Sequence, residues 1–117
     1  NIADAAALTN YGRPFVAVQW GCWTIYDVDP SNASLVHSLL FSGDQGAVAV
    51  LGATTLTGVG TQAYLGQLLT LRLATPGMSI GQAVRDAKLE FAQMHPKLSD
   101  VLLGWSLLGD PALVIEP

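Results

Sequence analysis

The run GAVAVLG at residues 46–52 places an uninterrupted apolar segment between two glycines, and this pattern indicates the fold class. Every residue from 47 to 51 is apolar, which is typical of a strand covered on both faces by other layers. Glycine at both ends favours termination of the strand at these positions. The sequence therefore predicts a short buried strand near the middle of the chain.

A second apolar run lies upstream, and a helical pattern separates the two runs. Residues 15–20, FVAVQW, follow Pro14 and have the composition of another buried strand. Between the two runs, apolar side chains recur at helical spacing at Leu35, Val36, Leu39 and Leu40. Strands joined through a helix run parallel with a right-handed crossover. We therefore expect the two runs to be parallel strands.

The downstream half continues this alternation. Residues 53–60 form a loop rich in glycine and threonine, and residues 61–74 have a helical pattern. A further helix is expected to begin at an S-x-x-Q capping box, with the Gln82 side chain reaching back to the Ser79 amide. Residues 105–108 and 112–115 are expected to be extended, on either side of a Gly-Asp-Pro turn. This order predicts an α/β fold with a mainly parallel sheet.

Cys22, the only cysteine of the chain, follows the first predicted strand. Open α/β sheets place their reactive groups at the carboxyl ends of the strands, so Cys22 and the 53–60 loop are expected to be neighbours. A free cysteine is most often a small buried hydrophobic residue, whereas an exposed one at a strand end is a candidate nucleophile. Trp23 is the tryptophan best placed to line a cleft beside it. The pattern alone leaves both interpretations of Cys22 open.

The composition indicates that something else covers part of this chain. Half of the residues are hydrophobic and 12% are charged, whereas an average domain has about 25% charged residues. A small free-standing domain has a large surface to keep in water and needs more charge than this. We expect the rest of the same protein, a second processed chain or an oligomer partner to cover one face.

Several function classes are disfavoured. A net charge of −4 provides no basic surface for nucleic acid, and no apolar run approaches the ~18 residues of a membrane span. One cysteine is too few for a thiolate-based structural zinc site, and Asp27 and Asp29 are too few to argue for calcium. The glycines of residues 52–60 lack phosphate-loop and dinucleotide spacing. We expect no nucleic-acid partner, no metal and no cofactor.

Four segments, taken in order, resemble the C-terminal half of the catalytic domain of gingipain-type cysteine peptidases. They are the strand leading to Cys22, GDQGAVAVLGATTLTG at residues 43–58, MSIGQAVRDAK at residues 78–88 and LLGDPALVI at residues 107–115. The resemblance extends from Tyr11 to Ile115. It implies a caspase-like three-layer sandwich with a mainly parallel sheet, of which residues 1–117 are the C-terminal portion.

The resemblance also implies roles for particular residues. Cys22 matches the nucleophile of the family, and its backbone amide matches one donor of the oxyanion hole. The loop at residues 53–60 matches a wall of the primary specificity pocket. The candidate pocket residues are Trp23, Thr54, Thr55, Thr57 and Gly58.

Two departures from the family pattern bear on activity. The family commonly has glycine three residues after the cysteine, where this chain has Ile25, which could crowd the site. The family's catalytic histidine lies upstream of the cysteine in a His-Gly pair, and no histidine precedes Cys22 here. His37 points away from the apolar stripe of its predicted helix, and His95 lies at a helix end next to Pro96. Neither is expected to be the partner of Cys22.

Two functions follow from these patterns. The first is a cysteine endopeptidase fragment that carries the nucleophile, acts on peptide or protein substrates in the whole protein and is inactive alone because its histidine lies upstream. The alternative is a catalytically inactive caspase-like module used for interaction or regulation, which the two departures favour. The resemblance further implies an extracellular or cell-envelope location.

Overall fold

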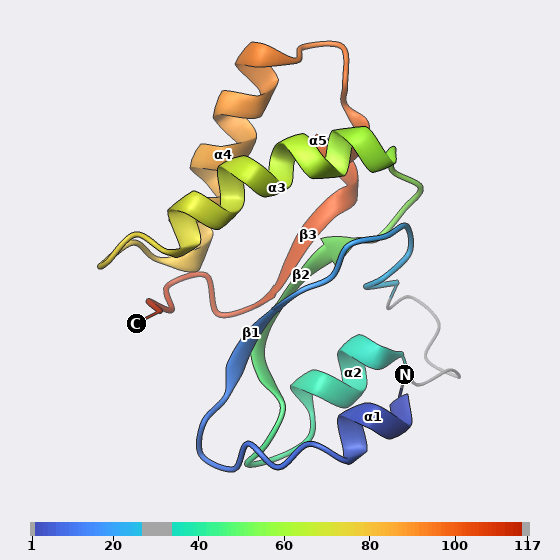
Figure 1. Ribbon diagram of the computed structural model, residues 1–117, viewed down its shortest axis with the longest axis vertical. Helices are drawn as coiled ribbons and strands as arrows, with labels where there is room; N and C mark the ends of the chain where they lie inside the picture. The colour runs from blue at the N-terminus through green and yellow to red at the C-terminus, as the bar shows by residue number, and fades with distance from the viewer. Residues whose placement is uncertain (1, 27–33, 116–117) are drawn as a thin grey trace.

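A computed structural model describes residues 2–26 and 34–115 of the 117-residue chain. The elements in chain order, labelled in Figure 1, are α1 (Ile2–Ala6), β1 (Phe15–Val18), α2 (Leu35–Leu40), β2 (Ala47–Ala53), α3 (Val59–Leu73), α4 (Ile80–Met94), α5 (Asp100–Gly104) and β3 (Trp105–Gly109). The alternation of strands and helices confirms the predicted α/β class.

The strands form one sheet in the order β1-β2-β3. β1 and β2 are parallel, with Val18 opposite Leu51, as the intervening helix predicts. β3 pairs antiparallel to β2, with Trp105 opposite Ala53, so the described sheet is mixed where a mainly parallel one was expected. The reason is that α5 leads directly into β3 at the carboxyl end of β2, where the Thr54 N–H donates to the Gly104 carbonyl at 2.8 Å. The chain re-enters the sheet from that end and must run back along β2.

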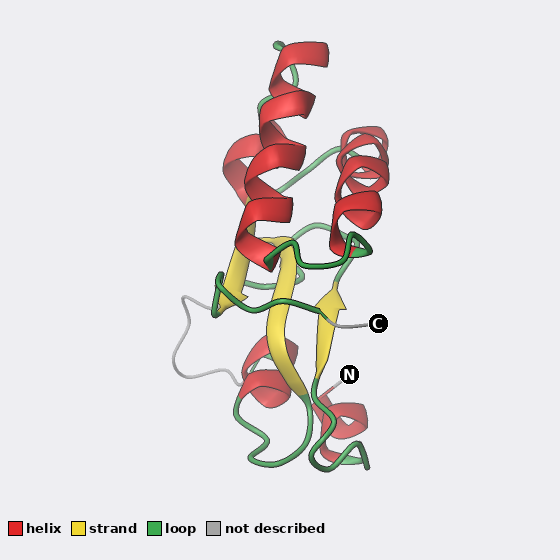
Figure 2. Ribbon diagram, turned by 90° about the vertical axis from the view of Figure 1, so that its left-hand side faces the viewer, coloured by secondary structure: helices red, strands yellow, loops and turns green. Residues whose placement is uncertain are grey.

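Helices cover both faces of the sheet and give it three layers. Figures 1 and 2 show α3 and α4 on one side of the strands and α1 and α2 on the other. An irregularity in the β1–β2 register leaves Val48 without a partner, as at a β-bulge. Ala47 and Ala49 consequently face opposite layers, the first toward α2 and the second toward α3 and α4.

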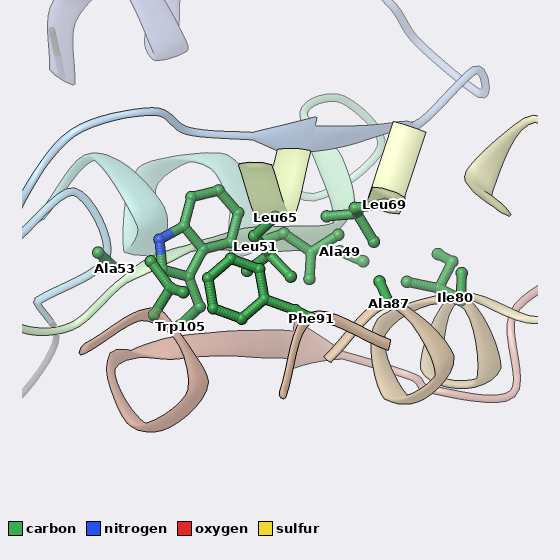
Figure 3. Close-up of a cluster of buried hydrophobic side chains, with 11 residues drawn as sticks. Ala49, Leu51, Ala53, Leu65, Leu69, Ile80, Ala87, Phe91 and Trp105 are labelled. Carbon is green, nitrogen blue, oxygen red and sulfur yellow. The ribbon is translucent and has the colours of Figure 1, made fainter. Parts of the chain in front are cut away.

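The larger hydrophobic core lies between the sheet and the helices α3, α4 and α5. Figure 3 shows Phe91 from α4 pointing toward β2, next to the indole of Trp105. Phe91 is completely buried and Trp105 nearly so. Alternate residues of β2 contribute to this core, in which Leu51 packs against Leu65 of α3. This core fixes α3 over the sheet, and the first turn of α3 borders the site described below.

The helix and strand bounds agree with the predictions in the middle of the chain and differ near its ends. The short helices α1 and α5 were not predicted, and residues 112–115 do not join the sheet. They run beside the start of α4, where the Pro111 and Leu113 carbonyls accept hydrogen bonds from the first turn of that helix at 2.8 Å. The Ser79 side chain caps α4 by accepting from the Gln82 N–H. The reverse bond from the Gln82 side chain is not formed within the described residues.

None of the described helices is both long enough and apolar enough to cross a membrane. The turn carrying Asp27 and Asp29 lies outside the described residues.

Candidate active site

The segment after β1 stays attached to β2 and carries Cys22 to the rim of the sheet. The Gln19 N–H donates to the Leu51 carbonyl at 2.8 Å, and the Trp23 N–H donates to the Thr55 carbonyl at 3.2 Å. The hydroxyl of Thr24 accepts a further bond from the Ala53 N–H at 3.3 Å. These bonds to the last residues of β2 and the loop after it hold the Cys22 turn in one position.

Two local features allow this turn to lie so close to β2. A Cβ atom at Gly52 would lie 2.8 Å from the Thr24 hydroxyl and 2.9 Å from the Ile25 side chain, so only glycine leaves room for the turn. Trp23 has a φ of 60°, a left-handed conformation that is uncommon for a bulky residue. Strained backbone of this kind is concentrated at functional sites.

Ile25, which replaces the family's usual glycine, points into the protein. Its side chain is completely buried in the smaller core, together with Val36 and Val50. It is not among the residues that line the cavity beside Cys22 within the described part of the chain. The predicted crowding of the site by this side chain is therefore not seen.

Cys22 is exposed, and its sulfur contacts the loop after β2. The thiol donates to the Thr57 carbonyl at 3.1 Å, and the sulfur accepts from the Thr57 N–H at 3.4 Å. The two segments predicted to be neighbours at the sheet rim are thus in direct contact. The neighbouring amides of Gly21 and Trp23 are hydrogen-bonded, whereas the Cys22 N–H has no partner within the described residues. A free N–H beside the sulfur is the requirement for an oxyanion donor.

Gln62, in the first turns of α3, connects the two segments. It is 5% exposed, and its Oε1 accepts from the Gly21 N–H at 2.8 Å. Its Nε2 donates to the Thr57 hydroxyl and lies 3.5 Å from the Thr57 carbonyl. Gln62 therefore connects Gly21, which precedes Cys22, to Thr57, which contacts the sulfur. Gln62 was not predicted as a site residue, because a polar residue in a helix has no distinguishing sequence pattern.

A cavity of about 480 Å³ opens beside the sulfur. Its lining residues come from the Cys22 turn and from the start of α3; they are Trp20, Gly21, Cys22, Val59, Gln62 and Ala63. Trp20 lies 4.9 Å from Trp105, centroid to centroid, and a Cβ at Gly66 would lie 2.0 Å from its ring. Gly66 therefore lets the indole approach the backbone of α3 closely, where Trp20 forms one wall of the cavity.

The five predicted pocket residues occupy different places around this turn, and none is among the lining residues of the cavity. Thr57 is buried against the sulfur, and Trp23 is half-exposed and contacts Tyr26 edge-on. Thr54 bonds the Gly104 carbonyl through its N–H and its hydroxyl, and the Thr55 carbonyl accepts from Trp23. The Gly58 N–H donates to Asp100. Their role in a substrate pocket stays a prediction.

Asp100 supports the loop that follows β2. Its Oδ2 accepts from the Gly58 N–H at 2.6 Å and from the Thr61 hydroxyl at 2.9 Å, both at the beginning of α3. Burial alone would raise the pKa of Asp100, but the hydrogen bonds from Gly58, Thr61 and Val101 outweigh burial and lower the pKa below its ordinary value. The ionised carboxylate thus links the N-termini of α3 and α5.

Neither histidine contacts Cys22 within the described residues. His95 stacks on Tyr64 with ring centroids 4.8 Å apart, and His37 lies near Phe41 on α2. Neither ring lines the cavity beside the sulfur. In the part of the chain that the structure describes, no three histidine, cysteine or acidic side chains gather as they would around a metal ion.

An exposed cysteine at the rim of an α/β sheet, with an adjoining cavity and a backbone N–H that has no partner in the described part of the chain, is the type of site found in cysteine-dependent hydrolases. The chain belongs to peptidase family C25, whose sequence profile matches residues 1–116. This match confirms the resemblance to the gingipain-type peptidases.

Solved structures show the same fold. A complex of the RgpB pro- and mature domains from Porphyromonas gingivalis matches with a TM-score of 0.85 and 14% identity. A crystal structure of the Arg-specific cysteine proteinase gingipain R (RgpB) matches with a TM-score of 0.76 and 16% identity. Each comparison covers 98% of this chain and 29% of the other, so the chain corresponds to part of a larger structure. None of the curated proteins compared with the chain matches it.

Proposed function

We propose that the chain is the nucleophile-bearing, C-terminal portion of a cysteine endopeptidase catalytic domain, extending over residues 1–117. The observation that carries this proposal is that Cys22 is exposed beside an open cavity, with its sulfur bonded to Thr57 and its N–H without a partner among the described residues. A buried thiol among aliphatic side chains would have contradicted it. Membership of family C25 supports the same conclusion.

The chemistry would follow the general scheme for thiol nucleophiles. An imidazole from the upstream part of the protein removes the thiol proton, and the sulfur attacks the carbonyl carbon of the substrate peptide. The Cys22 N–H donates to the oxyanion as it develops. The C–N bond then breaks, the imidazolium gives its proton to the leaving amine, and a thioester joins the substrate to Cys22. Water hydrolyses the thioester and restores the thiol.

The rest of the catalytic domain, or a second processed chain, is the proposed partner of this chain. The match to a complex of pro- and mature domains, together with the 29% coverage, supports a partner of this kind. The histidine would come from that partner, which is why we expect the isolated chain to be inactive. An extracellular or cell-envelope location is proposed on the same family relationship.

Labelling with an electrophilic peptide tests the proposal. The longer protein that contains this chain should react covalently at Cys22 and should cleave peptides, and Cys22→Ala should abolish both. Thr70→Ala, an exposed change on α3, serves as the control and should leave both intact. Labelling that survives Cys22→Ala would contradict the assignment. A folded protein that neither labels nor cleaves would favour the inactive interaction or regulatory module.

A further inference from the structure

We propose that Asp100 is a positioning residue for Cys22 and that it acts through the peptide group joining Thr57 to Gly58. The two ends of this one peptide group have different partners. Its carbonyl oxygen accepts from the Cys22 thiol at 3.1 Å, and its N–H donates to the Asp100 carboxylate at 2.6 Å. The inference rests on the proposed function and adds a residue that determines where the sulfur points.

A peptide group transmits orientation from one end to the other because it is planar. In the trans form its carbonyl and its N–H point to opposite sides. A bond that fixes the Gly58 N–H therefore also fixes the direction of the Thr57 carbonyl. A carboxylate acceptor polarises the amide as well, which makes the carbonyl at the other end a stronger acceptor for the thiol. Asp100 thus both directs and strengthens the bond that holds the sulfur.

The carboxylate is itself held in place and is charged. Its second bond comes from the Thr61 hydroxyl at 2.9 Å. A Cβ at Gly58 would lie 2.5 Å from that hydroxyl oxygen, so the glycine leaves room for Thr61 to reach Asp100. Burial would raise the pKa of Asp100, but hydrogen bonds, among them those from Gly58 and Thr61, lower the pKa below its ordinary value. At neutral pH the group is therefore in the ionised form, which polarises the peptide most.

The loop that carries Thr57 is attached to α5 at both of its ends. At its beginning, the N–H and the hydroxyl of Thr54 donate to the Gly104 carbonyl at 2.8 and 3.0 Å. At its end, the Gly58 N–H donates to Asp100. Asp100 and Gly104 are the first and last residues of α5, so one short helix sets the position of the whole loop. Thr57 lies between the two attachments, where it is buried and contacts the sulfur.

The expected consequence for the reaction is a fixed rotamer of Cys22. This residue is exposed, so without a partner its side chain would distribute over three staggered rotamers. The bond to the Thr57 carbonyl selects one of them. A substrate carbonyl must meet the sulfur in one orientation, and an even distribution would leave only about a third of the molecules in the productive rotamer. Loss of the Asp100 acceptor should therefore slow the reaction with peptides by about threefold.

The S–H stretching band of Cys22 tests the contact directly. In the longer protein, the infrared difference between each variant and its Cys22→Ala counterpart isolates this band, which moves to higher wavenumber as the hydrogen bond from the thiol weakens. Asp100→Asn keeps an uncharged acceptor and should move the band part of the way, and Asp100→Leu should move it further. Thr61→Val, which removes the other bond to the carboxylate, should leave the band in place. An unmoved band in Asp100→Leu, or no band in the wild type, would overturn the inference.

Labelling rates connect the band with function. A ketone-bearing peptide probe should label Cys22 about threefold more slowly in Asp100→Leu, with Asp100→Asn between this variant and the wild type. Iodoacetamide reaches the sulfur in any rotamer, so its rate should change much less. Equal slowing by both reagents, or a Thr61→Val protein as slow as Asp100→Leu, would mean that Asp100 only supports the fold. If no peptide probe labels the folded wild type, the proposed function fails, and the infrared comparison still decides whether Asp100 directs the thiol.

Discussion

At the scale of single residues, Gln62 is the side chain on which the arrangement around Cys22 depends. Gln62→Leu removes the acceptor for the Gly21 N–H and the donor to Thr57 while keeping a similar volume. The turn that carries Cys22 then loses two of its anchors, and the Cys22 N–H loses its fixed direction. We expect labelling of Cys22 by a peptide probe in the longer protein to slow by about tenfold or more, because loss of one oriented donor has effects of at least this size.

Iodoacetamide distinguishes this positioning role from a general loss of structure. This small reagent needs only an accessible thiol, so its rate should change much less than the peptide-probe rate in Gln62→Leu. Gln67→Leu, on the exposed side of the same helix, should alter neither rate. If both reagents slow equally, or if the melting temperature falls enough to unfold the protein, Gln62 is structural and not positioning.

The site was only partly predictable at this scale. The contact between Cys22 and the loop at residues 53–60 follows from strand order, because parallel strands bring their carboxyl ends together. Strand order does not predict which residues line the cavity. Val59 and Ala63 line it because of the direction in which α3 continues from the loop. Strand order fixes which loops meet, whereas helix direction fixes which side chains face the space between them.

At the scale of elements, Asp100 is the connection between α5 and α3, and its titration should be visible in stability. Hydrogen bonding lowers the pKa of this carboxyl in the folded protein, so its stabilising contribution is complete above the unfolded value of about 3.9 and is lost as the pH falls through the lower folded value. We expect the melting temperature of the chain, measured by circular dichroism, to fall across this acidic range.

Asp100→Asn provides the comparison. The variant should melt a few degrees lower at neutral pH, because an amide oxygen is a weaker acceptor than a carboxylate for the Gly58 and Thr61 donors. The difference between the two proteins should shrink as the pH falls below about 4. Asp86→Asn, a change at a partly exposed position on α4 where the carboxylate pairs with Arg85, should not reproduce this convergence. Parallel curves for wild type and Asp100→Asn would exclude the linkage.

Helices and strands were predictable where their hydrophobic pattern continues over many residues. They were unpredictable where tertiary contacts define them. The helical pattern of α4 and the apolar run of β2 identified both elements. The five-residue helix α5 has too few residues to show a period, and it owes its place to Asp100 and to Lys88, whose Nζ donates to the Leu102 and Trp105 carbonyls. Residues 112–115 have the sequence pattern of a strand. The missing side chain of Gly81 lets Pro111 lie close to α4, and the segment pairs with the start of that helix instead of with the sheet.

At the scale of the whole molecule, the chain is a flat body with more surface than its size requires. Its extents are 40 × 34 × 19 Å. Its accessible area of 6772 Å² exceeds the roughly 6,100 Å² expected for a compact protein of this mass. β1 lies at one edge of the sheet, and Phe15 at its start is exposed. An unpaired edge with apolar side chains is a surface that another strand can join.

The isolated chain should therefore self-associate, and the remainder of the protein should suppress this. We expect sedimentation velocity at micromolar concentration to show dimers or larger species for residues 1–117 alone. Phe15→Lys should shift the distribution toward monomer, because a charged side chain on an edge strand opposes strand addition. Leu89→Lys, which replaces an exposed apolar residue on α4 far from the strand edge, should leave the distribution unchanged. A monodisperse monomer of the unmodified chain would mean that the β1 edge needs no covering partner.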